Sequence, residues 1–373
     1  MNIDPKRKQF SEILNLLAEE LDISPTKRMD AAEKYRAVSD WLAAKEGSCL
    51  ERYKPEIYPH GSFRLGTVVR PLGRDEFDLD FTCELQINNS ARPDQVKGLV
   101  GQRLLENGRY EGIATPLNRC WRINYAGDFH MDIMPGIPDV DHELGNILVS
   151  DRKLASWIRS NPSGYARWFD EVMKPIRETI RFEVKASVEA LPDDKIKTPL
   201  QVAIQILKRH RDLRFQHDLD NRPGSIILTT LAAKAYNQEE DLFSAILAIA
   251  TGMPDKIEQD GEGHPVVLNP ANLSENLAEK WKEHPERLTK FKSWLADVRT
   301  DLHALLSKGD LPSIAELLED RFGTSESKAA IRKHGEQLNE SHRLGNVVFG
   351  TGTIAVGSPS IATPVRRNRF YGA

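Results

Sequence analysis

The five-residue run Phe77–Phe81, with the sequence FDLDF, constrains what this 373-residue chain can fold into more than any other feature. Its three apolar residues alternate with Asp78 and Asp80. A period of two is typical of a β-strand, because successive side chains point to opposite faces of a sheet. The run therefore predicts a strand whose apolar face packs on a core while its two carboxylates share the other face.

Two carboxylates on one strand face are suited to metal-dependent phosphoryl transfer. They lie about 6.6 Å apart along the strand, and such a pair can hold two magnesium ions about 3.5 to 4 Å apart, which clamp an in-line displacement. This chain contains the Asp-x-Asp pattern two more times, at residues 139–141 and 218–220. Those pairs lie among Pro, His and Asn residues, which predicts solvated loops.

Gly61 and Ser62 stand just before this strand and predict a helix start that could bind a triphosphate. The first N–H groups of a helix are unpaired and its dipole is positive there, so the position favours anions. Glycine lets a phosphate approach the backbone, and serine adds a hydroxyl. Taken alone, a Gly-Ser pair is equally typical of a turn or a helix cap.

Asp132 is the candidate third acid, which would accept the proton of an attacking hydroxyl and complete one metal site. It lies in the strand-like run Asp128–Pro135, and the preceding run Cys120–Tyr125 with a turn at Ala126-Gly127 predicts a hairpin. The hairpin would place Asp132 beside the first two acids. The alternative is a strand-end turn former before Pro135, but alternation of polar and apolar residues in the run favours the catalytic role.

In the order Gly61-Ser62, Asp78-Leu79-Asp80 and Asp132, the chain resembles the DNA polymerase beta-like nucleotidyltransferases. Among them it is most similar to the CD-NTases, the DncV-like bacterial relatives of cyclic GMP-AMP synthase and oligoadenylate synthase. The likeness covers about two-thirds of the chain. It implies an α+β fold with two lobes, in which a mixed-sheet catalytic lobe packs on a helical lobe.

The resemblance also assigns two residues in the helical half to the donor triphosphate, because the family places a lysine on one helix and a serine at the start of a later one. Here these are Lys208 and Ser225. The residues themselves allow other interpretations. Lys208 could be a surface lysine in the basic turn 208–211, and Ser225 could be an N-cap after Pro223-Gly224.

Composition limits the class of protein. Hydrophobic residues make up 40% of the chain and charged residues 28%, and the sequence contains neither an apolar run of membrane-spanning length nor a signal-peptide pattern, so we expect a soluble cytoplasmic protein without a membrane partner. Cys49, Cys83 and Cys120 are widely spaced and odd in number, which argues for reduced thiols and against a zinc site. The net charge of -4 disfavours a broad nucleic-acid surface, so nucleic acid should not be required.

The sequence suggests three regions. Residues 1–150 should form the nucleotidyltransferase lobe with its N-terminal helices, which break at residues 24–26, and residues 151–343 a helical lobe that begins with one long helix over 165–191. Residues 344–373 are rich in Gly, Ser, Thr and Pro and predict a flexible tail.

The tail ends in Arg366, Arg367 and Arg369 followed by two aromatic residues and Gly-Ala. A flexible basic tail of this kind resembles those of CD-NTases encoded with a ubiquitin-transfer-like enzyme. The resemblance implies that the partner joins the carboxylate of Ala373 to a target amine. The alternative is a disordered terminus with a chance basic cluster.

The residues and the resemblance together predict a cyclic-oligonucleotide synthase of bacterial antiphage signalling (CBASS). The substrate would be ATP, with GTP a further candidate, and two Mg²⁺ ions, or Mn²⁺ in their place, would bind Asp78, Asp80 and Asp132. The enzyme would release pyrophosphate and make a cyclic di- or trinucleotide for a downstream effector. The alternatives are a template-free or protein-modifying nucleotidyltransferase and a catalytically silent nucleotide-binding scaffold, which the intact set of three acids disfavours.

Overall fold

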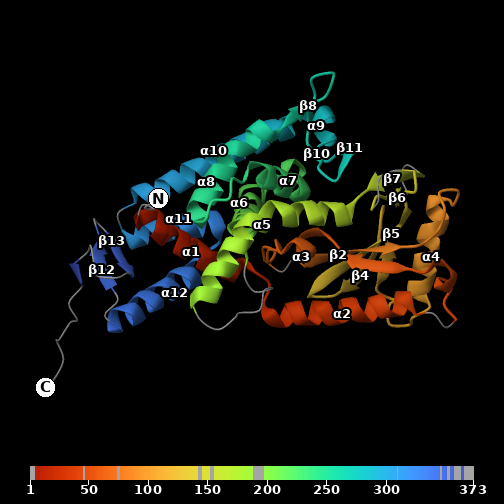
Figure 1. Cartoon of the computed structure of the whole chain (residues 1–373), viewed down its shortest axis with the longest axis horizontal. Coiled ribbons are helices and arrows are strands. Elements are labelled where there is room, and N and C mark those ends of the chain that lie inside the picture. Colours follow the sequence, from red (N-terminus) through yellow and green to blue (C-terminus); the bar gives the residue numbers. More distant parts are fainter. Residues whose placement is uncertain are drawn as a thin grey trace. The chain divides into compact units, whose positions relative to one another are not determined.

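The computed structural model describes residues 5–44, 47–73, 76–141, 145–151, 155–187, 197–308, 310–344, 347–350, 353–356 and 363–364. These residues belong to two compact units (Figure 1). The sheet unit comprises Ile23–Lys197 and Ile257–Glu283. The helical unit comprises Thr198–Lys256, the residues up to Asp22 and those from His284 onward.

The described part of the sheet unit is built on a seven-stranded sheet with the order β1-β2-β5-β4-β3, in which β6 pairs with β5 and β7. The strands β2 and β5 run parallel, whereas the other neighbouring strands pair antiparallel. The sheet is therefore mixed, as expected. Its strands are β1 (Glu56–Pro59), β2 (Phe77–Glu84), β3 (Ala114–Pro116), β4 (Trp121–Tyr125), β5 (Phe129–Pro138), β6 (Ile147–Asp151) and β7 (Ser156–Ser160).

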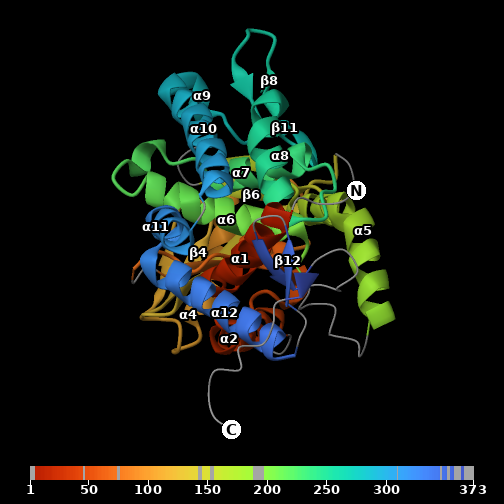
Figure 2. The same cartoon turned by 90° about the vertical axis from the view of Figure 1, so that its left-hand side faces the viewer.

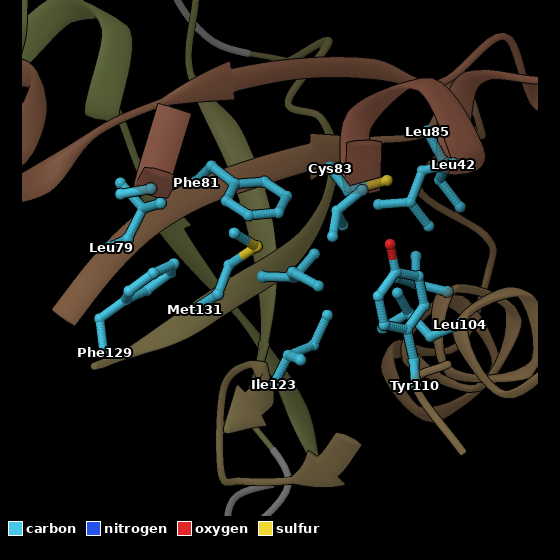
Figure 3. Packing of buried hydrophobic residues seen from close by; sticks show 14 of the residues in the cluster. Leu42, Leu79, Phe81, Cys83, Leu85, Leu104, Tyr110, Ile123, Phe129 and Met131 are labelled. Atoms are coloured by element: carbon cyan, nitrogen blue, oxygen red, sulfur yellow. The ribbon is translucent and has the colours of Figure 1, made fainter. Parts of the chain in front are cut away.

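The apolar face of this sheet forms the core of the unit. Leu79 and Phe81 of β2 and Met131 of β5 are at most 1% exposed, since the alternation in both strands turns these side chains to the same face. They belong to one hydrophobic cluster with Leu42 and Leu104, which helices α2 and α4 contribute (Figure 3). The predicted strand and its buried face are thus confirmed, and the polar face is left for the site.

Helices and short hairpins complete the sheet unit. The helix break at Ser24 is confirmed, because the Ser24 hydroxyl caps α2 by accepting from the Lys27 amide. Pro175 lies inside α5, which bends along its length (Figure 1). The elements are α2 (Pro25–Ala43), α3 (Gly61–Leu65), α4 (Pro93–Leu105), α5 (Pro162–Ser187), α9 (Lys280–Glu283), β8 (Glu258–Gln259), β9 (Pro265–Val266), β10 (Leu268–Asn269) and β11 (Asn272–Asn276).

The helical unit gathers helices from both ends of the chain. The N-terminal helix α1 packs on α6, α8 and α12 (Figure 2). A capping box between Thr198 and Gln201 starts α6 at the expected residue. The helices are α1 (Pro5–Leu21), α6 (Pro199–Arg214), α7 (Ser225–Ala235), α8 (Leu242–Gly252), α10 (Pro285–Ser307), α11 (Leu311–Phe322) and α12 (Thr324–Arg343).

The division of the chain into units differs from the sequence prediction: α5 and residues 257–283, expected in the helical lobe, belong to the sheet unit. The expected division after residue 150 falls inside β6, and β7 pairs antiparallel with β6, so both strands belong to the sheet unit. The sequence predicts helix α1 in the catalytic lobe, but α1 belongs to the helical unit. A helix finds its place by where its apolar face is buried, and sequence order does not decide this.

The expected flexible tail contains regular structure. Strands β12 (Val347–Gly350), β13 (Thr353–Val356) and β14 (Thr363–Pro364) form a small antiparallel sheet. Val, Ile, Thr and Phe residues concentrate in these segments, and such residues favour strands. Segments of the expected flexible tail thus form strands, whereas Arg366–Ala373 lie outside the described residues.

No helix of the described residues is long and apolar enough to cross a membrane.

Gly101 tests the packing of α4 on the sheet. A Cβ at Gly101 would lie 2.0 Å from Cζ2 of Trp121 on β4, so Gly101→Ala must displace the indole ring. We expect a loss of about 1 to 3 kcal/mol in the free energy of unfolding, measured by urea titration. Gly98→Ala in the same helix is the matched control, because no atom lies within 4 Å of its Cβ position. It should stabilise the protein by up to about 1 kcal/mol, and equal effects of the two variants would contradict this packing.

Candidate active site

The structure brings the three predicted acids together on the polar face of the sheet. Asp78 and Asp80 lie on β2, and Asp132 lies directly opposite Asp80 on the parallel neighbour β5. The Asp78 side chain is 53% exposed, while that of Asp132 is 16% exposed, so the cluster runs from the surface inward. Neighbouring strands are about 4.8 Å apart, which places the carboxylates within reach of shared cations.

Arg122, which the sequence analysis did not select, binds two of these acids. It lies on β4 opposite Asp132. Its Nε donates to Oδ1 of Asp132 at 2.7 Å and its Nη2 to Oδ2 at 2.7 Å, and Nη2 also donates to Oδ1 of Asp78 at 3.0 Å. The signal for this residue was present in the sequence, because Arg122 is a polar residue in the alternating strand that pairs with the Asp132 strand.

The donor set fits a divalent cation in kind. Carboxylate oxygens are the ligands that Mg²⁺ takes in proteins. The pKa of Asp78 is raised above its ordinary value, chiefly by burial and also by the neighbouring Asp132. Arg122 and His130 act in the opposite direction. Within the described residues, no group of three or more His, Cys, Asp or Glu side chains is arranged to hold a metal ion. Arg122 engages both oxygens of Asp132 and one of Asp78.

A histidine lies beside Asp78 and also contacts a glutamate. His130 lies opposite Asp78 on β5, and its Nδ1 is 3.5 Å from Oδ1 of Asp78. Its Nε2 is 2.9 Å from Oε2 of Glu76. The other Glu76 oxygen accepts the Gly127 amide at 2.6 Å, which ties this chain of contacts to the hairpin turn. The contacts limit the orientations that the Asp78 carboxylate can adopt.

Gly61 begins a helix, as predicted, and packs tightly against an acid of the site. Its φ is +63°, and a Cβ there would lie 2.3 Å from Oδ2 of Asp80. Glycine is therefore required both for the backbone conformation and for space. The helix α3 that Gly61 and Ser62 open has five residues. Such a short helix has a small dipole, so any phosphate binding here would depend mainly on its unpaired N–H groups.

His60 anchors this turn to the acid strand. Its backbone N–H donates to the Asp80 carbonyl at 2.9 Å. Its side-chain Nε2 is buried and has no hydrogen-bond partner within the described structure. Burial lowers the pKa of His60 to about 4, although the nearby Asp132 raises it. The imidazole is therefore neutral at neutral pH and adds no positive charge to the acid cluster.

The pKa of His60 predicts a pH dependence of stability. Between pH 6.5 and about 4 the unfolded chain binds a proton that the folded protein does not, so the free energy of unfolding falls as the pH falls through this window. The loss should reach about 3 kcal/mol. Urea titrations from pH 7 to pH 4 measure it, with His60→Asn as the comparison. The variant should lack this part of the slope, and identical pH profiles would contradict the assignment.

Lys208 and Ser225 both lie in the helical unit. Lys208 on α6 is 5% exposed, so the surface-lysine alternative is wrong. Ser225 is the first residue of α7, and Gly224 occupies the N-cap position, so the N-cap alternative is wrong too. The Ser225 hydroxyl accepts from Nη1 of Arg211 at 3.0 Å, and its own proton can still be donated.

The other Asp-x-Asp pairs do not resemble the first. Asp139 was expected in a solvated loop, but it is 5% exposed and accepts from Nε of Arg159 at 3.2 Å. It follows β5 directly, so the sheet buries it. Asp218 is the N-cap of a short 3₁₀ turn and Asp220 lies within that turn, and Asp218 accepts from Asn221. The three cysteines carry free thiols.

Comparisons with known proteins agree with this fold and site. Residues 8–172 match the Second Messenger Oligonucleotide or Dinucleotide Synthetase domain. The chain is 32% identical to a c-di-GMP synthase of Roseivirga ehrenbergii over 98% of both chains. It is 24% identical to the cyclic dinucleotide synthase CdnG of Bradyrhizobium diazoefficiens, over 97% of this chain and 94% of that protein. The structure of that CD-NTase in complex with GTP superposes with a TM-score of 0.71 at 21% identity, covering 87% of this chain and 97% of the other.

The mixed sheet and the helical unit are those of a DNA polymerase beta-like nucleotidyltransferase. The chain belongs to the CD-NTase family and is a nucleotidyltransferase that synthesises cyclic oligonucleotides. The expected fold class and enzyme class are thereby confirmed. The roles of the individual site residues stay predictions.

Proposed function

We propose that this enzyme makes cyclic di-GMP from two molecules of GTP. The observation that carries the proposal is the register of β2 and β5, which sets Asp80 opposite Asp132 with Asp78 on the same face. Nucleotidyl transfer requires this kind of carboxylate cluster beside a turn that can approach a phosphate. Gly61 supplies that turn, because its backbone packs directly against Asp80.

The proposed reaction takes place twice. A ribose hydroxyl of one nucleotide attacks the α-phosphorus of the other, a phosphodiester bond forms, and pyrophosphate leaves; a second transfer within the linear intermediate closes the ring. Asp132 accepts the proton of the attacking hydroxyl. Asp78 and Asp80 would hold the divalent ions, which would supply positive charge against the charge that develops on the phosphoryl oxygens.

GTP is the proposed substrate because of the relatives. The Roseivirga protein is a c-di-GMP synthase, and the Bradyrhizobium protein was solved with GTP. The sequence analysis expected ATP as the main substrate, and no feature of this site selects a base. GTP therefore replaces ATP as the proposed substrate because of these two relatives, and the product assay distinguishes the two nucleotides.

Loss of the first two acids should abolish the product. With labelled GTP, ATP or both, followed by phosphatase, the wild type should give a resistant product from GTP alone, because a cyclic product has no terminal phosphate. Asp78→Asn with Asp80→Asn should lower its formation by at least about a thousandfold, since the metal clamp supplies several kcal/mol of transition-state stabilisation.

The matched control is Asp218→Asn with Asp220→Asn, the same double change in a pair at a short 3₁₀ turn of the helical unit. It should keep full activity. A resistant product that requires ATP would overturn the choice of GTP. A phosphatase-sensitive product would favour the template-free alternative, and normal turnover in the Asp78 and Asp80 double variant would overturn the metal site.

Lys208 and Ser225 are proposed to contact the donor triphosphate. Lys208→Met keeps the buried stem and removes the charge, so the Kd for GTP should rise about 10- to 100-fold, as expected for a charge-assisted hydrogen bond. Ser225→Ala should cost less, about 2- to 10-fold. Isothermal titration measures both, with the exposed Lys292→Met on α10 as control. If both variants bind GTP like the wild type, these residues serve the fold alone.

The biological setting is a proposal from the resemblance. We propose that the messenger acts on a downstream effector in antiphage defence (CBASS), and that a ubiquitin-transfer-like partner joins the carboxylate of Ala373 to an amine. The support is the basic and aromatic sequence from Arg366 to Ala373. These residues lie outside the described part of the chain, and the relatives give no information about such a partner.

A further inference from the structure

We propose that Arg122 is a positioning residue of the active site whose guanidinium takes the place of the divalent cation among the catalytic carboxylates and so sets the affinity of the enzyme for metal. The inference rests on the proposed metal site of Asp78, Asp80 and Asp132. It adds that this site carries its own competing cation.

The first argument is the number and geometry of the contacts. Arg122 donates to both oxygens of Asp132 at 2.7 Å, a bidentate arrangement that is among the strongest ion pairs in proteins. The same Nη2 atom also donates to Asp78 at 3.0 Å. One guanidinium therefore links two acids from different strands, which is what a bridging metal ion would do.

The second argument is placement. Arg122 lies opposite Asp132 and Asp132 lies opposite Asp80, so the backbone of three adjacent strands aligns the cation with the acids. The arginine side chain is 25% exposed, so it lies at the edge of the site toward solvent. Hydrogen bonds to Asp132 raise the pKa of Arg122 further above its already high value. Arg122 therefore leaves the carboxylates as a charged guanidinium that the metal ion displaces, and not by losing its proton.

The consequence is competition. A divalent ion on the carboxylates would lie within a few ångströms of a positive guanidinium, and the repulsion opposes binding until Arg122 moves. While no metal is bound, the positive charge of Arg122 thus offsets the repulsion among the three carboxylates. The same charge weakens metal binding.

The test is a titration of the full chain with Mn²⁺ in the absence of nucleotide, in which electron paramagnetic resonance measures the free ion. Arg122→Gln should bind Mn²⁺ about tenfold more tightly than the wild type, because the competing charge is gone. Arg119→Gln is the matched control, because Nε of this arginine donates to the buried Asp151 at 3.0 Å. The control should bind Mn²⁺ like the wild type.

Two further measurements keep the inference testable if Arg122→Gln is unstable. Without metal this variant should melt below the wild type, and saturating Mg²⁺ should raise its Tm more than that of the wild type. Arg122→Lys keeps the charge but cannot bridge two oxygens, so its Mn²⁺ affinity should fall between those of the wild type and Arg122→Gln. The Mg²⁺ concentration for half-maximal product formation should follow the same order.

Equal or weaker Mn²⁺ binding in Arg122→Gln and Arg122→Lys would overturn the inference. Its failure can be told from failure of the proposed metal site by adding Asp78→Asn and Asp80→Asn to Arg122→Gln. If Mn²⁺ binding then persists unchanged, the ion is not on these carboxylates and the metal site itself is wrong. If binding disappears while Arg122→Gln alone equals the wild type, only the role of Arg122 is wrong.

Discussion

Repulsion between carboxylates is the constraint on which the site depends. Asp78, Asp80 and Asp132 share one face of two adjacent strands, where like charges oppose one another. The fold accommodates them because Arg122, from the next strand, lies among them and binds two of the three. The apolar side chains on the opposite face of the same strands supply the burial that holds the strands in this register.

The backbone contributes as much to the site as the side chains do. The His60 amide binds the Asp80 carbonyl, and the positive φ of Gly61 brings the chain into contact with the Asp80 carboxylate. The turn that could bind a phosphate and the strand that could bind a metal are therefore one rigid piece of structure. Neutral His60 fits this piece because a protonated ring would have to be buried there at a high cost in free energy.

The helical unit buries basic side chains of one helix against neighbouring helices. Four consecutive residues of α6, Lys208 to Arg211, are at most 6% exposed. His210 binds Asp301 on α10 at 3.0 Å and accepts from the indole of Trp294, while Arg211 binds Ser225 and the Pro223 carbonyl at the start of α7. A basic run that is typical of a solvated helix end instead connects α6 to its neighbours. Side chains on successive positions of a helix point about 100° apart. His210 and Arg211 therefore reach different partners.

The sequence by itself determined the strand Phe77–Phe81, the hairpin that carries Asp132, the helix start at Gly61 and the enzyme class, because alternation, glycine and capping residues act locally. It did not determine the register of the hairpin. A two-residue turn at Ala126-Gly127 would pair Tyr125 with Asp128, but the Asp128 amide binds the Tyr125 carbonyl and Tyr125 pairs with Phe129. A shift of one residue moves every side chain to the other face, so only the folded hairpin placed Arg122 opposite Asp132. The tertiary structure likewise decided which unit α1 joins and buried Asp139 and Lys208, since burial depends on neighbours that are distant in the sequence.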